Sequence, residues 1–157
     1  MGGIEIVRGS EKDAEVCFEI FQKAVMELTR DDYTLAQRIA WAGESMDRDR
    51  WLNRMSENKV FLAKKDDTIL GFAELKENML IDMMYVLPGH ARHGVGESLL
   101  KAVEHEVRQQ DEDRISAYIS RSARPFFEKR GFTVSWENQI ERSGELLTNF
   151  LMVKDLR

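Results

Sequence analysis

Near the middle of the chain, the hydrophobic pattern changes from that of a strand to that of a helix across a glycine-bearing loop. Residues 79–87 form an apolar run of strand length, and from Leu99 to Val107 the apolar residues recur on one face of a helix. Gly94 and Gly96 permit a tight turn and a close approach of a ligand to the backbone. The unpaired N–H groups that begin the helix face this loop with the positive end of the helix dipole. The sequence therefore predicts an anion site at this loop, with a diphosphate as the first candidate ligand.

The remaining segments predict a single α/β domain over residues 1–157, because no repeat and no linker-like stretch divides the chain. Alternation and turn residues predict strands at 4–8, 60–63, 69–76, 79–87, 115–119, 134–142 and 146–153, with Ser143-Gly144 joining the last two. Helical spacing predicts helices from residue 10 or 13 to 28, within 33–55 as two short pieces interrupted at 43–47, from the loop to 110, and at 122–129. Ser122 is the expected N-cap of the last helix, and Gly131 fits the left-handed position beyond it.

Charge and composition exclude several classes of function. The net charge of −5 and the pI near 5.3 argue against nucleic acid as a partner and mildly favour a cationic substrate. No apolar run approaches the roughly 20 residues that span a bilayer, and no leader precedes the chain, so we expect neither a membrane partner nor export. The single cysteine, Cys17, and three histidines provide no internal disulfide and no zinc site, which indicates a reducing cytoplasm and no metal.

Two common nucleotide-binding motifs fail at the glycine loop. A Walker loop requires Gly-Lys followed by Ser or Thr, whereas Gly96 is followed by Glu97 and Ser98. A dinucleotide fingerprint requires a third glycine near position 99, where the chain has Leu99. The glycine pattern therefore needs a wider context before it indicates a ligand.

Two ordered motifs supply that context. The strand ends in Val86-Leu87-Pro88, and the loop continues as Ala91-Arg92-His93-Gly94-Val95-Gly96 before the helix. Farther along, residues 123–132 have the sequence Ala-Arg-Pro-Phe-Phe-Glu-Lys-Arg-Gly-Phe. In these motifs and in the order of its elements, the chain resembles the GCN5-related N-acetyltransferases (GNAT). Its residues 33–41 and 139–150 are similar to those of the small bacterial YafP-type branch.

The resemblance implies a fold and a reaction. The fold would be α/β, of the α+β kind, with a mixed, mostly antiparallel sheet of about seven strands and about four helices. Strands 79–87 and 115–119 would splay apart to admit the pantetheine arm. Acetyl-CoA would be the co-substrate, and its acetyl group would pass directly to a primary amine. Main-chain N–H groups near Val86 would hold the thioester and its developing negative charge.

The resemblance also implies which residues contact acetyl-CoA. They lie at the end of the strand, in the loop and around the second motif: Tyr85, Val86, Ala91, Arg92, His93, Gly94, Val95, Gly96, Glu97, Ser122, Pro125, Phe126 and Lys129. Arg121, Arg124 and Arg130 accompany Lys129 as cations that could hold the 3′-phosphate, although such clusters are usually solvated faces. Ala91 replaces the family's Gln or Arg, but the loop grips phosphate through main-chain N–H groups, so binding survives.

Candidate catalytic groups are few. Asp82 is a carboxylate in an apolar strand, where alternation would place it on one face with Met84 and Val86. It is either the base or anchor for the amine, or a hydrogen-bonded structural aspartate. Glu74 on the neighbouring strand is a second carboxylate for the same role. Phe127 stands where many members have the tyrosine that protonates the leaving thiolate, which leaves Tyr118 as the best remaining phenol.

The acceptor side is less defined. Tyr33 and Trp41 either line the acceptor pocket or belong to the core. A small metabolite, a drug, a peptide and a protein lysine all remain open as acceptors, and the chain is a monomer or a homodimer. Two other functions stay open: a non-catalytic acyl-CoA-binding or sensing module, which Ala91 and Phe127 motivate, and a structural or interaction protein without affinity for CoA.

Overall fold

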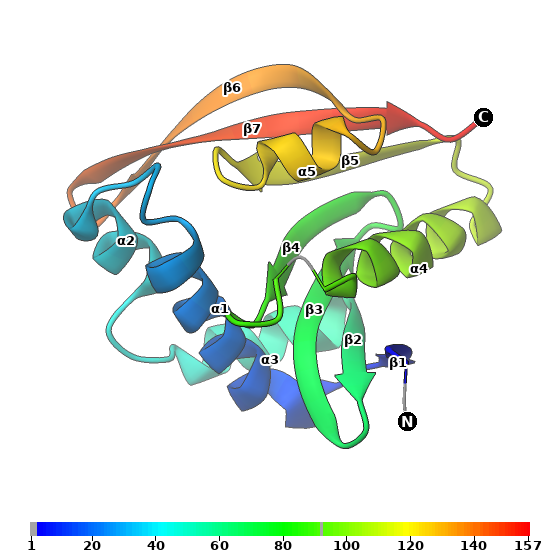
Figure 1. The fold of residues 1–157 in the computed structure, drawn as a ribbon, viewed down its shortest axis with the longest axis horizontal. Coiled ribbons are helices and arrows are strands. Elements are labelled where there is room, and N and C mark those ends of the chain that lie inside the picture. Colours follow the sequence, from blue (N-terminus) through cyan, green and yellow to red (C-terminus); the bar gives the residue numbers. More distant parts are fainter. Residues whose placement is uncertain (1–2, 92) are drawn as a thin grey trace.

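The computed structural model describes residues 3–91 and 93–157. Seven strands form one sheet, and helices pack on both of its faces (Figure 1). In chain order the elements are β1 (Glu5–Arg8), α1 (Ala14–Leu28), α2 (Leu35–Ala42), α3 (Arg48–Glu57), β2 (Lys59–Lys65), β3 (Thr68–Lys76), β4 (Leu80–Val86), α4 (Val95–Gln109), β5 (Arg114–Ser120), α5 (Arg124–Glu128), β6 (Thr133–Arg142) and β7 (Glu145–Asp155). A 3₁₀ turn, Glu11–Asp13, precedes α1.

The sheet has the strand order β1-β2-β3-β4-β5-β7-β6. Among the described strands, β4 and β5 form the one parallel pair, and every other neighbouring pair is antiparallel. This confirms the predicted mixed, mostly antiparallel fold. The predicted pair of short helices within 33–55 is also confirmed as α2 and α3, which brings the described α-helices to five, against about four expected.

Polar side chains begin the N-terminal helices as the sequence suggests. The main-chain N–H of Ser10 donates to the Asp13 carboxylate at 2.9 Å at the start of the first helical segment. At α2, the N–H of Gln37 donates to the Thr34 hydroxyl, and the Gln37 side chain accepts from the N–H of Thr34. The pair at α2 is reciprocal, and all three bonds satisfy main-chain N–H groups that have no partner within the helix. The predicted cap of α5 is wrong: the Ser122 hydroxyl donates to Asp32, and the helix begins at Arg124.

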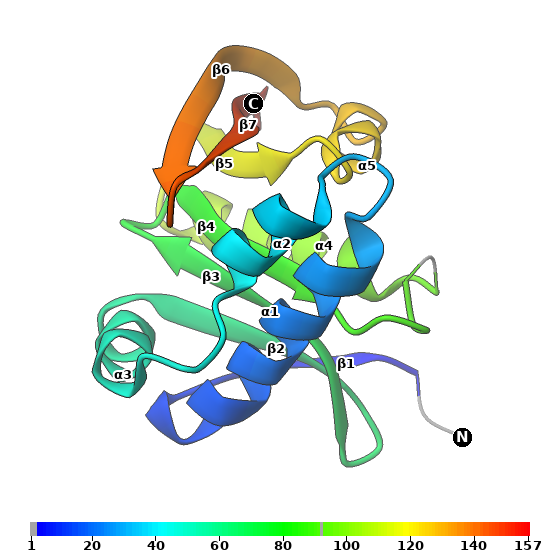
Figure 2. The same cartoon turned by 90° about the vertical axis from the view of Figure 1, so that its left-hand side faces the viewer.

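Two hydrophobic clusters lie on opposite faces of the sheet. The first, called here the α4-side cluster, joins the inner face of α4 to β5 and β7 and includes Leu99, Val103 and Phe127. The second, the α1-side cluster, joins α1 and α3 to β2 and β3 and includes Phe21 and Trp51. Figure 2 shows α1, α2 and α3 together on the side of the sheet away from α4. Both faces of the central strands are therefore covered.

β4 and β5 separate soon after they meet. Among the described residues, their register joins Leu80 to Ser116 and Ile81 to Ala117, and no later residue of either strand is paired across this gap. The predicted splay is thus confirmed, and it leaves the second half of each strand free along the facing edge. At this edge β4 ends at Val86, and the chain continues through Leu87 and Pro88 into the glycine loop.

A bulge in β4 reverses the faces that strict alternation predicts. Glu74 of β3 pairs with Met83 and Leu75 pairs with Ile81, so Asp82 is the extra residue. Met84 and Val86 pack on the α4-side cluster, whereas Asp82 bonds Arg54 of α3 on the other side. The expectation that Asp82 shares a face with Met84 and Val86 is therefore wrong. One inserted residue exchanges the two faces of a strand.

Within the described residues, no helix is long and apolar enough to cross a membrane.

Candidate active site

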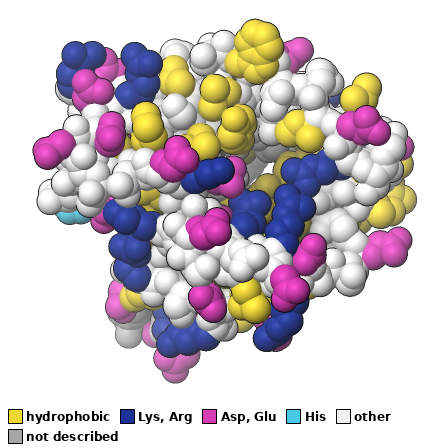
Figure 3. Space-filling view, turned by 180° about the vertical axis from the view of Figure 1, so that it is seen from behind, with side chains coloured by type: hydrophobic (Ala, Val, Ile, Leu, Met, Phe, Trp, Pro, Cys, Tyr) yellow, Lys and Arg dark blue, Asp and Glu magenta, His cyan; other side chains and the backbone are white. Residues whose placement is uncertain are grey.

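A cavity of about 570 Å³ lies over the gap between β4 and β5. Helices α2 and α3 form one wall, and the β6–β7 hairpin forms the other. Asp82, Met84 and Tyr85 of β4, with Tyr118 of β5, line its floor. Figure 3 shows a hollow in the surface, with hydrophobic side chains inside it and Lys and Arg side chains at its edge. A ligand in this cavity would therefore meet the free edges of both strands.

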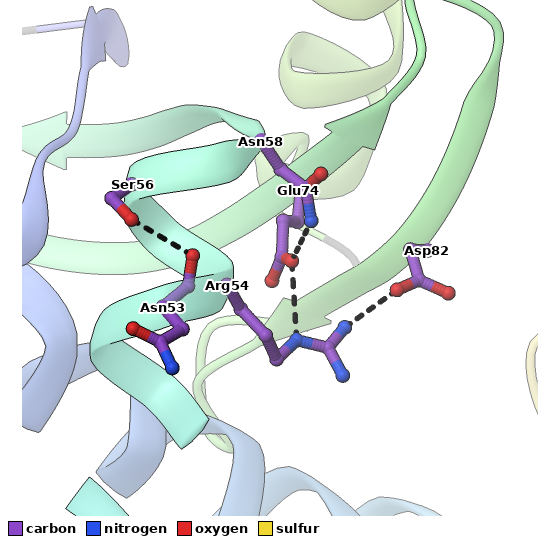
Figure 4. Close-up of polar contacts among 6 residues, drawn as sticks. All are labelled: Asn53, Arg54, Ser56, Asn58, Glu74 and Asp82. Carbon is purple, nitrogen blue, oxygen red and sulfur yellow. Dashed lines mark hydrogen bonds and ion pairs between the residues drawn. The ribbon is translucent and has the colours of Figure 1, made fainter. Parts of the chain in front are cut away.

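Arg54 bridges two carboxylates, one on the floor of the cavity and one buried behind it. Its Nε donates to Glu74 Oε1 at 3.2 Å, and its Nη2 donates to Asp82 Oδ2 at 2.7 Å (Figure 4). Asn58 donates a further hydrogen bond to Glu74 Oε1 at 2.6 Å. The Glu74 side chain is 1% exposed, while that of Asp82 is 26% exposed. Asp82 lines the cavity, and Glu74 lies behind Arg54 and is not among the lining residues.

Local structure explains this arrangement. The Asp47 carboxylate accepts a hydrogen bond from the N–H of Arg50 and so caps the start of α3. Arg54 follows Arg50 by one helical turn, so both side chains lie on the cavity side of the helix. The bulge in β4 turns Asp82 toward the same side. Charged groups from three separate elements thus meet at one point.

Tyr33, predicted for the acceptor pocket, is a buried wall residue with both hydrogen-bonding functions in use. Its hydroxyl donates to the main-chain oxygen of Thr148 and accepts from the N–H of Arg121 at 3.0 Å. Burial raises the pKa of this phenol, and the hydrogen bond from Arg121 opposes that rise. Its ring packs edge-on against Trp41 with centroids 5.2 Å apart. Both residues line the cavity, and Tyr33 also ties the α1–α2 connection to β7.

Tyr85 was expected to contact acetyl-CoA, and its side chain lies in the α1-side cluster. It packs against Phe21 at 5.1 Å, Phe72 at 6.0 Å and Trp41 at 6.5 Å between ring centroids. Burial raises its pKa, so the phenol stays protonated. The side chain therefore lines the cavity from within the α1-side cluster, and the main chain of Tyr85 lies along the free edge of β4.

Tyr118 and Phe127 both line the cavity, in different environments. The Tyr118 side chain is on β5 and is 42% exposed, and no described residue forms a hydrogen bond with its hydroxyl. Phe127 is buried in the α4-side cluster, where it packs edge-on against Phe126 and Phe132. Of the two positions considered for a leaving-group acid, Tyr118 is therefore the one with a phenol open to the cavity.

The two loop glycines have different structural roles. Gly94 is the N-cap of α4 with φ of +84°, and a Cβ there would meet nothing within 4 Å. Positive φ suits glycine, and the open space leaves the first N–H groups of α4 accessible. A Cβ on Gly96 would lie 3.2 Å from the Phe126 ring, so this glycine lets α4 approach α5 closely. Of its neighbours, Val95 is buried, Ala91 is partly buried, and His93 and Glu97 are exposed. Arg92 lies outside the described residues.

The cations around α5 differ in what they contact. Arg121 donates to the main-chain oxygen of Asp32 and lies over the Tyr33 ring. Arg124 pairs with Glu128 at 3.4 Å, and Arg130 donates to the main chain of Phe126 and covers its ring. Lys129 is exposed and forms no ion pair with any residue of the described ranges. Pro125 is exposed in the first turn, and Ser122 and Phe126 are partly buried.

Sequence reasoning missed Arg54. Two carboxylates in otherwise apolar strands require a counter-charge, which is the signal that a partner exists. Nothing in the local pattern distinguishes Arg54 from Arg48 or Arg50 on the same helix. The structure also shows no cluster of His, Cys, Asp or Glu suited to a metal ion within residues 3–91 and 93–157.

Comparison with known proteins agrees with this architecture. Residues 29–154 match the family model described as "Acetyltransferase (GNAT) domain". The chain is 32% identical over 152 residues to the Escherichia coli (strain K12) protein named "Uncharacterized N-acetyltransferase YafP", covering 97% of this chain and 96% of that protein. A crystal structure from Rhodopseudomonas palustris, described as a GCN5-related N-acetyltransferase, "Aminotransferase, Class-II", has a TM-score of 0.94 and 32% identity, with 99% and 98% of the two chains covered.

A more distant structure has the same fold. It is the PaiA N-acetyltransferase from Thermoplasma acidophilum in complex with coenzyme A, with a TM-score of 0.77 and 22% identity, covering 98% of this chain and 99% of that chain.

Proposed function

Because this chain belongs to the GNAT family and is an acetyl-CoA-dependent N-acetyltransferase, we propose that it transfers the acetyl group directly to a primary amine held in the cavity. The position of Asp82 carries the proposal. Its carboxylate is partly exposed on the cavity floor, beside the free edge of β4, and Arg54 holds it in place. An amine in the cavity would therefore have a proton acceptor next to the gap in the sheet.

The chain offers a fitting place for acetyl-CoA, which would supply the acetyl group as a thioester. Gly94 leaves the start of α4 open to a diphosphate, whose charge the first N–H groups and the helix dipole would stabilise. Beyond Ile81, main-chain N–H groups of β4 near Val86 have no partner on β5 and would hold the thioester oxygen. Related folds with coenzyme A or acetyl-CoA bound, from Thermoplasma acidophilum and Salmonella typhimurium, support this assignment.

Asp82 would accept the proton that the amine must lose, directly or through one water. The amine nitrogen then forms the new C–N bond with the acetyl carbon, the C–S bond breaks, and the CoA sulfur leaves as a thiolate. Glu74 and Arg54 orient the Asp82 carboxylate and do not touch the reacting atoms. Tyr118 or water would return a proton to the sulfur. Near neutral pH a thiolate is a tolerable leaving group, so Phe127 is compatible with catalysis.

A thiol-release assay with acetyl-CoA and a panel of amines tests the proposal. We expect release of CoA that depends on the amine, together with a product heavier by one acetyl group. If acetyl-CoA binds but no amine is acetylated, the proposed function becomes that of an acyl-CoA sensing module. Phe127, in place of a tyrosine acid, favours this alternative. If acetyl-CoA does not bind, both the enzyme and the sensing module are excluded.

A further inference from the structure

The cavity that holds the proposed acceptor has a cationic side as well as an anionic one. We propose that the acceptor is an amine that also carries a carboxylate or phosphate group, which Arg50 and Arg142 recognise from opposite walls. This inference rests on the proposed function and specifies the class of substrate. Net charge mildly favours a cationic substrate, and this inference adds an anionic group to the same molecule.

The anionic side is the cluster of Glu74, Arg54 and Asp82. It contains one cation and two carboxylates, and both carboxylates bond the same guanidinium. The two carboxylates use two of the five N–H donors of Arg54 and outweigh its single positive charge, so a ligand anion would meet a net negative cluster here. The remaining negative charge of the cluster reaches the cavity through Asp82, which suits the ammonium end of an acceptor.

Arg50 provides one of the two cations. It lines the cavity from α3, one helical turn before Arg54. The neighbouring Asp47 carboxylate is bonded to the main-chain N–H of Arg50, where it caps the helix. Across the described part of the chain, no carboxylate lies within ion-pair distance of the Arg50 guanidinium. This guanidinium is therefore exposed with its donors available.

Arg142 provides the other cation from the facing wall. It ends β6, and alternation along that strand places Asn138, Ile140 and Arg142 on one face, all three of which line the cavity. Among the ion pairs of residues 3–91 and 93–157, none involves Arg142. Two free guanidinium groups from separate elements thus border one cavity, a donor arrangement that matches carboxylate or phosphate.

Matched acceptor pairs test the inference. The panel sets phenylalanine against phenylalaninamide, β-alanine against β-alaninamide, and phosphoethanolamine against ethanolamine, with CoA release at fixed acetyl-CoA as the readout. We expect the member of the best pair that carries the carboxylate or phosphate to have a kcat/KM about 10-fold or more above the partner that lacks it. The amino acids and phosphoethanolamine separate carboxylate from phosphate recognition.

Variants connect that preference to the two arginines. Arg50→Gln and Arg142→Gln should each raise KM for the acceptor with the anionic group about 10-fold, a much larger effect than on kcat/KM for the partner that lacks this group. Arg48→Gln is the matched control, because Arg48 lies on the same helix but pairs with Glu15 of α1 outside the cavity. All three positions are exposed, so the variants should keep the native circular dichroism spectrum.

The outcomes separate this inference from the proposed function. If amines without a carboxylate or phosphate are acetylated as efficiently as those with one, or if both arginine variants keep the preference, the inference is wrong while the enzyme assignment stands. If no amine of either kind releases CoA although acetyl-CoA binds, the proposed function itself fails, and the inference falls with it.

Discussion

The main-chain N–H of Arg121 donates a hydrogen bond to the hydroxyl of Tyr33, 88 residues earlier in the chain, at 3.0 Å. The same hydroxyl donates to the main-chain oxygen of Thr148, so one phenol connects the α1–α2 segment to the ends of β5 and β7. The two sides of the cavity are therefore held at a set separation by this residue.

Tyr33→Phe should destabilise the protein by about 1–2 kcal/mol, because it removes two part-buried hydrogen bonds, one from the N–H of Arg121 and one to the main-chain oxygen of Thr148. KM for the acceptor should rise as the wall loosens. Urea unfolding measures the first effect and amine titration the second. Tyr118→Phe removes an exposed hydroxyl and should stay within about 0.5 kcal/mol of wild type. Equal stability of both variants would contradict the role of Tyr33.

Asp82→Asn should lower turnover on the order of 100-fold with little change in acetyl-CoA affinity, because general-base catalysis contributes that much. Glu74→Gln is the comparison: it alters a group that is 1% exposed, so its effect should appear mainly in unfolding. Wild-type turnover of Asp82→Asn across the pH range would assign proton removal to water.

Gly94→Ala should weaken acetyl-CoA binding about 10-fold, because a side chain at φ of +84° costs about 1–2 kcal/mol and rotates the first N–H groups of α4. Calorimetric titration with acetyl-CoA measures the effect. Gly144→Ala has φ of +83° with equally open space in the β6–β7 turn, so it should cost similar stability and keep full affinity. A loss of affinity in both variants would point to general destabilisation.

Lys129→Gln should reduce the affinity for CoA but not for 3′-dephospho-CoA, because Lys129 is the cation near α5 whose exposed side chain forms no ion pair, hydrogen bond or ring contact with the described residues, unlike Arg121, Arg124 and Arg130. The ratio of the two affinities is the readout, measured at low salt where exposed charges are least screened. Arg124→Gln changes a cation that already pairs with Glu128 and should leave the ratio unchanged. An unchanged ratio for Lys129→Gln would remove this residue from the phosphate site.

Burial raises the pKa of the Cys17 thiol from 9.0 to about 12, with Asp13 and Glu74 adding to the rise. The unfolded chain releases this proton first, so the thiol lowers stability as pH rises above 9, by about 1.4 kcal/mol per pH unit until pH 12. Urea unfolding of wild type and Cys17→Ala at pH 8 and pH 10 should show a larger loss for wild type. Equal losses would mean that the folded thiol titrates normally.

Periodicity and turn residues predicted most of the fold because they are local signals. The strand, loop and helix around Gly94, the turn at Ser143-Gly144 and the positive φ of Gly131 all depend on neighbours in sequence. The site depends on longer contacts. Arg54 meets Asp82 across 28 residues, and Tyr33 meets Thr148 across 115, so no window of the sequence displays either pair.

The bulge at Asp82 shows why the remaining prediction failed. Strict alternation predicts the face of each side chain only while the strand register is regular. One extra residue exchanges the two faces for all residues that follow it. Nothing in the residue types of Ile81 and Met83 marks the residue inserted between them. Asp82 lies on the cavity floor, and its role as base or amine anchor stays a prediction, while its partner Arg54 and the direction of its side chain depend on tertiary structure.

The short parallel contact between β4 and β5 also divides the molecule for folding. Strands β1 to β4 and strands β5 to β7 are each joined by antiparallel ladders, while Leu80–Ile81 with Ser116–Ala117 is the whole described ladder between the two groups. Two blocks with strong internal ladders and a two-pair seam are suited to open as separate cooperative units. Native-state hydrogen exchange would then give different free energies of opening for β4 and β5. A ligand bound across the seam would make these two free energies more alike.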